Sequence, residues 1–256
     1  MARYQVILAY DGTDFRGFQR QKNARTVQET VEAALRELGW QSRVLLSAGR
    51  TDTGVHAQGQ SIAFDLDWRH TPQELLRALN ANLPLDIAAR SIHLVPDSFH
   101  PRFAALARCY RYQLFCDDTR EPLMERLAWR VWPPVSYAQL VETAAYLVGT
   151  HDFSAFGTPL KAGGSTVRTI FKAGWQQQDK AYTFEIAGNA FLYRMVRRLV
   201  AYQVESSQGK SEPVSIRNYL DRADGKPMQG LAPAQGLTLV EVIYPQGLGR
   251  GSGILI

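Results

Sequence analysis

Ser47-Ala-Gly-Arg-Thr-Asp-Thr-Gly-Val-His-Ala-Gln-Gly-Gln60 is the most unusual stretch of this 256-residue sequence, and the rest of the chain is best interpreted outward from it. An apolar run, Val44 to Leu46, precedes it, and an alternating segment, Ser61 to Leu66, follows it. That order predicts a loop that leads into a strand. Three glycines of the stretch suit backbone positions that need a positive φ or a close approach by a ligand. They are Gly49, Gly54 and Gly59.

A cation, a hydroxyl group and a carboxylate are consecutive in this loop, as Arg50, Thr51 and Asp52. A carboxylate on such a loop, near a guanidinium that keeps it ionised, can act as a nucleophile or a general base. The same residues also fit an ordinary turn, because Asp-Thr-Gly is a common turn sequence and Arg50 can form a local ion pair with Asp52. The spacing alone leaves both interpretations open.

Strand and helix patterns alternate along the whole chain. Strands are predicted from alternation and β-branched content at Tyr4 to Tyr10, Ser61 to Leu66, Tyr110 to Phe115, Tyr182 to Ile186 and Leu237 to Tyr244. Helices are predicted after Thr26 and Thr71, which begin capping patterns, and at Ser136 to Val148 and Phe191 to Val204. This mixture predicts an α+β or α/β protein. We expect an N-terminal half at 1–106 that carries the Asp52 loop, a C-terminal half at 107–245 and a flexible, glycine-rich tail at 246–256.

Composition excludes several classes of protein and favours few. Hydrophobic residues make up 45% of the chain and charged residues 21%, which is ordinary for a globular protein and unlike a collagenous or disordered one. Twenty-nine basic residues against 24 acidic residues give a net charge of +5, which suits a polyanionic partner but also occurs in proteins that bind none. No secretory or membrane-spanning apolar segment is visible, so we expect a cytoplasmic protein. No histidine pair has metal-ligand spacing, so no metal is expected.

The motif Gly-Arg-Thr-Asp-Thr-Gly-Val-His-Ala-x-Gly-Gln at 49–60 resembles the signature of the TruA family of tRNA pseudouridine synthases. Further segments resemble the family in the right order, over roughly residues 4 to 244. They are Tyr10 to Gln19, Arg25 to Glu29, Leu79 to Ile87, Arg108 to Tyr112, Gly149 to Phe153, Phe191 to Arg197 and Gly236 to Leu239. Ala201 departs from the glycine of many members, and the Pro159 to Ser165 loop looks altered.

The resemblance implies a pseudouridine synthase fold, with two related halves, a central antiparallel sheet flanked by helices and a cleft between the halves. It implies a homodimer without cofactor or metal. The implied reaction is the isomerisation of uridine to pseudouridine in the anticodon stem-loop of tRNAs, at the positions conventionally numbered 38, 39 and 40.

The resemblance also gives roles to four residues of this chain. Asp52 matches the catalytic aspartate, which acts as the nucleophile, and Tyr110 matches a tyrosine that lies against the target uracil. Arg197 matches an arginine that pairs with the catalytic aspartate, and Arg50 matches one that helps to extrude the target nucleotide. Without the resemblance, Tyr110 is an ordinary strand tyrosine and Arg197 belongs to a solvated helix face.

Two other kinds of function stay open from the sequence. One is a noncatalytic tRNA-binding or RNA-chaperone protein of the same fold, against which the intact set of Asp52, Tyr110 and Arg197 argues. The other is a different aspartate enzyme, such as a phosphotransferase, which would require Mg²⁺ and lose activity in EDTA.

Overall fold

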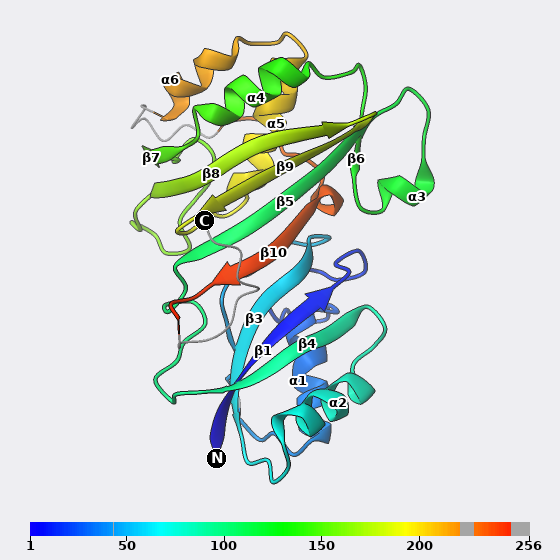
Figure 1. The fold of residues 1–256 in the computed structure, drawn as a ribbon, viewed down its shortest axis with the longest axis vertical. Helices are drawn as coiled ribbons and strands as arrows, with labels where there is room; N and C mark the ends of the chain where they lie inside the picture. Colours follow the sequence, from blue (N-terminus) through cyan, green and yellow to red (C-terminus); the bar gives the residue numbers. More distant parts are fainter. Residues whose placement is uncertain (43, 221–227, 247–256) are drawn as a thin grey trace. The chain divides into compact units, whose positions relative to one another are not determined.

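The structure is a computed structural model that describes residues 1–42, 44–220 and 228–246 (Figure 1). By its internal contacts the chain divides into two compact units. The first contains residues 1–107 together with the last described residues from Thr238, and the second contains 108–237. The expected halves at 1–106 and 107–245 stay a prediction, and the expected tail at 246–256 lies, apart from Gln246, outside the described residues.

The first unit is a sheet with two helices. Its elements are β1 (Ala2–Tyr10), α1 (Val27–Glu37), β2 (Leu46–Ser47), β3 (His56–Leu66), α2 (Pro72–Asn82), β4 (Ile87–Val95) and β10 (Leu237–Ile243). The strand order is β4-β1-β3-β10, and β2 pairs with β3. All pairings are antiparallel except that of β10, which runs parallel to β3 with Thr238 opposite His56.

Both helices of the first unit begin where the capping patterns predict. The Thr26 hydroxyl accepts from the Glu29 amide at 3.4 Å, and Thr71 and Glu74 form a complete capping box ahead of α2. Each cap satisfies amides that a helix cannot bond internally. The apolar stripes of the helices, such as Val31 on α1, are buried, and Figure 1 shows both helices against the same side of the sheet.

The second unit is also a sheet covered by helices. Its elements are β5 (Ala107–Cys116), α3 (Pro122–Glu125), β6 (Trp129–Val131), α4 (Tyr137–Ala145), β7 (Gly149–Asp152), β8 (Val167–Gln178), β9 (Ala181–Gly188), α5 (Met195–Ser207), α6 (Arg217–Leu220) and two short 3₁₀ turns at Pro213–Ile216 and Ala234–Gly236. The order β5-β9-β8-β7 is antiparallel throughout, and β6 runs parallel to β5. A buried hydrogen bond of 2.8 Å from the Trp175 indole to Gln203 ties α5 to β8. The α+β class, with mostly antiparallel strands flanked by helices, is confirmed.

Helix α5 starts later than the sequence pattern predicts. The expected helix begins at Phe191, whereas α5 begins at Met195. Tyr193 instead forms a bridge with Thr158, and Arg194 adopts a left-handed conformation with φ 62°. This conformation is uncommon for a residue other than glycine, and it redirects the chain into the helix. The apolar periodicity of 191–204 therefore overstated the helix by one turn.

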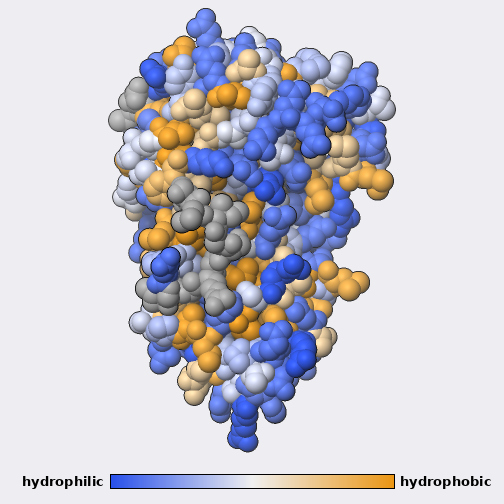
Figure 2. All heavy atoms as spheres, in the orientation of Figure 1, coloured by the Kyte–Doolittle hydropathy of each residue, from blue (hydrophilic) through white to orange (hydrophobic). Residues whose placement is uncertain are grey.

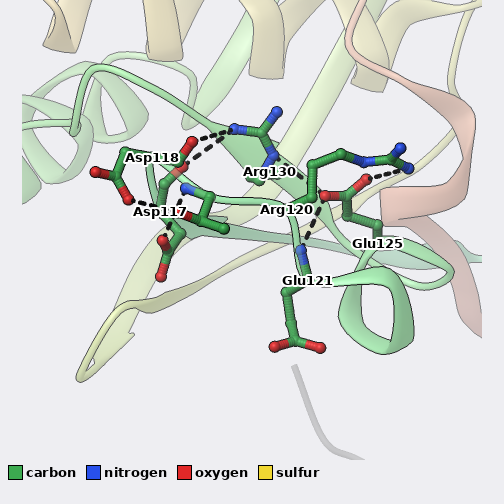
Figure 3. A network of polar contacts seen from close by, with 7 residues as sticks. Asp117, Asp118, Arg120, Glu121, Glu125 and Arg130 are labelled. Carbon is green, nitrogen blue, oxygen red and sulfur yellow. Dashed lines mark hydrogen bonds and ion pairs between the residues drawn. The ribbon is translucent and has the colours of Figure 1, made fainter.

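A short arm around α3, residues 117–132, presents apolar side chains to solvent. Leu123 is 88% exposed and Trp132 is 56% exposed, and Figure 2 shows hydrophobic atoms over α3. Ion pairs and hydrogen bonds hold this α3 arm in shape (Figure 3). Glu125 accepts from the Glu121 amide at 3.1 Å and from Arg130 at 3.1 Å, and Arg130 also donates to the Asp117 carbonyl.

Candidate functional site

The Asp52 loop, residues 47–56, is fixed from the residue next to the carboxylate. The Thr51 hydroxyl shares a buried hydrogen bond of 2.8 Å with the Tyr10 hydroxyl at the end of β1. The Thr51 carbonyl accepts from the Phe18 amide at 3.0 Å. Because the side chain and the backbone of Thr51 are both held, the backbone at Asp52 is also restricted, and so is the direction of its side chain.

Close backbone contacts fix the loop from the other side. A Cβ atom on Gly12 would lie 2.1 Å from the Val55 carbonyl oxygen, and one on Gly17 would lie 2.9 Å from that of Thr51. The Val55 amide donates to the Asp52 carbonyl at 3.1 Å, which closes a turn at Gly54, where φ is 78°. Only glycine fits where another backbone approaches this closely.

The expected positive φ is found at one of the three loop glycines, and a second glycine is approached closely by protein backbone. Gly54 has the positive φ, and a Cβ on Gly59 would lie 2.4 Å from the carbonyl oxygen of Val240 on β10. Gly49 has no positive φ, and a Cβ there meets nothing within 4 Å, so close approach by a ligand is the part of its prediction that stays open. Its carbonyl accepts from Gln60 at 3.0 Å, which any residue at 49 would allow.

His56 orders the end of the loop by hydrogen bonding. Its Nδ1 accepts from the Gly12 amide at 3.0 Å and lies 3.2 Å from a carboxylate oxygen of Asp11. An imidazole that accepts at Nδ1 carries its proton on Nε2 when it is neutral. His56 thus connects the turn after β1 to the start of β3.

The two candidate residues of this loop have different exposure. Asp52 is half-buried, whereas Arg50, two residues earlier, is exposed. A half-buried carboxylate on a loop held this firmly can meet a substrate with little rearrangement. An exposed guanidinium can instead reach a phosphate or a displaced nucleotide.

Tyr110 lies on β5 in the second unit. It is opposite Ile186 of β9, and its ring packs edge-on against Phe191 at a centroid distance of 5.1 Å. The side chain is half-buried, unlike that of Tyr112 on the same strand, which is fully buried. Phe191 therefore orients the Tyr110 ring and leaves part of it accessible.

Arg197 lies in the first turn of α5 and is held by the segment before β10. Its Nε donates to the Ala232 carbonyl at 2.8 Å, and the Ala232 amide donates to the Arg197 carbonyl at 3.2 Å. The Tyr112 hydroxyl donates to the neighbouring Pro233 carbonyl at 2.8 Å. Burial raises the pKa of Tyr112, and the charge of Arg197 partly opposes that shift. Tyr112 thus acts as a neutral hydrogen-bond donor that supports the Arg197 anchor.

Four basic residues lie between β1 and α1, and they divide into two pairs: Arg20 with Arg25, and Arg16 with Lys22. Arg20 pairs with the buried carboxylate of Glu32, and Arg25 forms two hydrogen bonds to Asp86, of 2.7 and 2.9 Å. Arg16 and Lys22 are exposed. Arg20 and Arg25 thus have structural partners, whereas exposed Arg16 and Lys22 suit a solvated loop and a phosphate contact equally well.

The described residues contain neither a candidate metal-binding cluster nor a helix able to span a membrane. Within 1–42, 44–220 and 228–246, no group of three His, Cys, Asp or Glu side chains could hold a metal ion. Across that same part of the chain, no helix has both the length and the apolar character needed to cross a bilayer.

Sequence reasoning missed the contribution of Tyr10. The bond from Tyr10 to Thr51 joins residues 41 positions apart, and periodicity gives no information about such a pair. The available signal was the Asp11-Gly12-Thr13 turn, which places Tyr10 at the end of β1. A tyrosine at the end of a buried strand frequently directs its hydroxyl to a polar partner.

Comparison with known proteins adds a family to this geometry. The sequence matches a family described as tRNA pseudouridine synthase over residues 6–104 and 143–245. Two similar proteins named tRNA pseudouridine synthase A come from Geobacter sp. (strain M21) and Acetivibrio thermocellus. The first is 38% identical over 96% of this chain and 100% of its own length, and the second is 37% identical over 95% and 100%.

A third relative of that name, from Alcanivorax borkumensis, is 38% identical over 96% of this chain and 92% of its own. A solved archaeal box H/ACA sRNP Nop10-Cbf5 complex aligns over 79% of this chain and 43% of that chain, with a TM-score of 0.36 and 11% identity. That similarity is too low to support an argument. The family match and the near full-length relatives are sufficient: the chain belongs to the tRNA pseudouridine synthase family.

Proposed function

We propose that this protein isomerises uridine to pseudouridine in the anticodon stem-loop of tRNAs, at positions 38, 39 and 40, with Asp52 as the nucleophile. The observation that carries the proposal is the Asp52 loop, where a half-buried carboxylate follows a threonine held by Tyr10 and Phe18. The reaction breaks the bond from ribose C1′ to N1 and forms a bond from C1′ to C5. The C5 hydrogen leaves as a proton, and N1, which kept the electron pair of the broken bond, takes up a proton. Atoms and electrons balance without a cofactor.

Asp52 attacks ribose C1′ or the uracil ring, or abstracts a ribose proton. Each route requires an ionised carboxylate held against the nucleoside. In this proposal the Tyr110 ring stacks on the target uracil, and its accessible, Phe191-supported ring suits that role. Arg197 keeps Asp52 ionised, and the exposed Arg50 contacts the extruded nucleotide.

Release of tritium from C5-labelled uridine in an unmodified tRNA transcript tests the proposal. We expect release by the wild type, no release by Asp52→Asn and normal release by Asp67→Asn, a control at an exposed aspartate. All three proteins should bind the transcript. Binding without release by the wild type would leave a noncatalytic tRNA-binding protein, and equal release by wild type and Asp52→Asn would remove Asp52 from the chemistry.

The proposal includes a cytoplasmic homodimer. Support for the dimer comes from the family resemblance and from the exposed apolar side chains of the α3 arm, Leu123, Met124, Leu127 and Trp132. Apolar groups of this kind, gathered on one short segment, favour contact with another protein surface. Light scattering of the wild type should give twice the mass of the chain, and a monomer mass would contradict this part of the proposal.

A further inference from the structure

The loop between β4 and β5, residues 96–106, carries the most exposed aromatic side chain of the described residues. Phe103 is 77% exposed, compared with 42% for Phe171 on β8. Leaving such a ring in water forgoes the favourable free energy of burying its apolar surface. A ring this exposed is therefore a candidate for contact with a partner.

Polar and cationic groups flank the Phe103 ring. The His100 ring lies at a centroid distance of 4.3 Å, and the Arg102 guanidinium carbon lies 5.7 Å from the ring centre. The His100 Nδ1 accepts from the Arg102 amide at 3.2 Å. Partial burial and the neighbouring Arg102 charge lower the pKa of His100, so the ring is neutral at pH 7 with its proton on Nε2. The trio combines a bare aromatic face, a cation and a hydrogen-bond donor.

Buried contacts hold the 96–106 loop in place. Phe99 is buried against the Tyr244 ring at 5.3 Å, and the Tyr244 hydroxyl donates to the Pro101 carbonyl at 2.8 Å. Arg3 donates to the Phe99 carbonyl at 3.1 Å and to the Asp97 carbonyl. The exposure of Phe103 is thus imposed by an anchored backbone, which keeps the entropy cost of binding low.

The 96–106 loop and the Asp52 loop lie at opposite ends of β1, within the first unit. Arg3, which holds the first, is near the start of β1, and Tyr10, which holds the second, is at its end. Tyr10 lies seven positions after Arg3 on this strand, which at about 3.3 Å per residue is roughly 23 Å. The two loops are therefore anchored at well-separated points of the same strand.

We propose that Phe103, with His100 and Arg102, is a stacking platform for a second unpaired base of the RNA substrate, away from the modified uridine. This proposal rests on the proposed function in one respect, namely that the substrate is tRNA. Unpaired bases stack on aromatic side chains and on guanidinium groups. The Arg102 charge and the His100 donor favour a nucleotide over an apolar protein segment.

The test compares Phe103→Ala, Phe103→Trp and Phe171→Ala, the last as a matched exposed phenylalanine. An unmodified tRNA transcript is titrated by fluorescence anisotropy at several salt concentrations. We expect about a tenfold higher Kd for Phe103→Ala, and nearly wild-type values for Phe103→Trp and Phe171→Ala. The salt dependence of Kd should not change for Phe103→Ala, since no charge is removed. In the tritium assay KM should rise while kcat at saturating tRNA stays unchanged.

Wild-type affinity for Phe103→Ala would overturn the inference. A lower mass by light scattering for Phe103→Ala, restored by Phe103→Trp, would also overturn it and indicate a protein contact instead. Thermal unfolding of each variant checks that the fold is intact. Failure of the inference is distinguishable from failure of the proposed function, because the binding comparison does not depend on tritium release.

Discussion

The Asp52 loop and the α3 arm are both irregular segments held in a fixed shape, but different interactions hold them. The Asp52 loop uses buried, mostly uncharged contacts, such as the 2.8 Å bond between Tyr10 and Thr51 and the glycine approach at Gly12. The α3 arm uses ion pairs near the surface, around Glu125. Buried contacts are insensitive to salt, whereas exposed ion pairs are screened by it. The comparison indicates that the backbone is held more firmly in the proposed catalytic loop than in the α3 arm.

The largest loss of stability and activity is expected at Gly12, where the Val55 carbonyl oxygen leaves no room for a Cβ atom. Gly12→Ala places a Cβ 2.1 Å from the Val55 carbonyl oxygen, so the Asp52 loop must move. Because overpacking against backbone is relieved only by such a movement, we expect a loss of about 3 kcal/mol or more in the free energy of unfolding. We also expect a fall in kcat of about a hundredfold, measured by urea unfolding and tritium release.

Gly49→Ala is the matched control in the same loop, since a Cβ there meets nothing within 4 Å. Its unfolding free energy should stay within about 0.5 kcal/mol of the wild type. Equal effects at the two positions would show that the close approach at Gly12 does not fix the loop.

A smaller effect is expected from the bond between Tyr10 and Thr51. Tyr10→Phe and Thr51→Val each break the bond between the two hydroxyl groups, and Tyr10→Phe leaves the buried Thr51 hydroxyl without the bond from Tyr10; each change should cost about 1–3 kcal/mol. The double variant removes both groups, so its loss in unfolding free energy should be smaller than the sum of the single losses. Urea unfolding of the four proteins measures this coupling, and strictly additive losses would contradict a direct bond.

The smallest effect is expected in the α3 arm. Burial alone raises the pKa of Glu125, but the Glu121 amide and the charges of Arg120 and Arg130 outweigh it and lower the pKa below its ordinary 4.5. The stabilisation is thus fully present above pH 4.5 and is lost as the pH falls through the lowered value. Glu125→Gln should speed amide exchange in the arm a few-fold at pH 7 in low salt, as measured by mass spectrometry.

The same variant in 1 M salt separates the two kinds of restraint. Screening should make Glu125→Gln and wild type exchange alike in the arm, while the amides of the Asp52 loop stay protected. If high salt instead left the arm of the wild type unaffected, the ion pairs of Figure 3 would not be what holds it.

Local chemistry explains which elements could be predicted from the sequence. The caps at Thr26 and Thr71 located α1 and α2 because their signals lie within one turn of each helix. Strands β4 and β8 were not predicted. In β8 the sequence ends in three exposed glutamines, Gln176 to Gln178, and lacks a clear apolar alternation. Strand β10 was predicted, but its parallel pairing with β3 joins segments far apart in the chain and could not be.

The candidate site divides in the same way. The positive φ of Gly54 was predicted from backbone chemistry, whereas the approach of Gly59 to Val240 was not, because a sequence does not show which glycine faces another strand. The supports of the site, Tyr10 for Thr51 and Ala232 for Arg197, depend on tertiary pairing and have no local pattern.

The position of β10 has a consequence for biosynthesis. The first unit contains nearly all of its strands within the first hundred residues. Its last strand, β10, which is the parallel partner of β3, is made only when the ribosome reaches residues 238–243. Until then the start of β3, at His56 and Ala57, lacks its pairing with β10, and Gly59 has no Val240 to approach. The sheet beside the Asp52 loop is therefore completed late in translation, and closing so long a loop slows the last folding step.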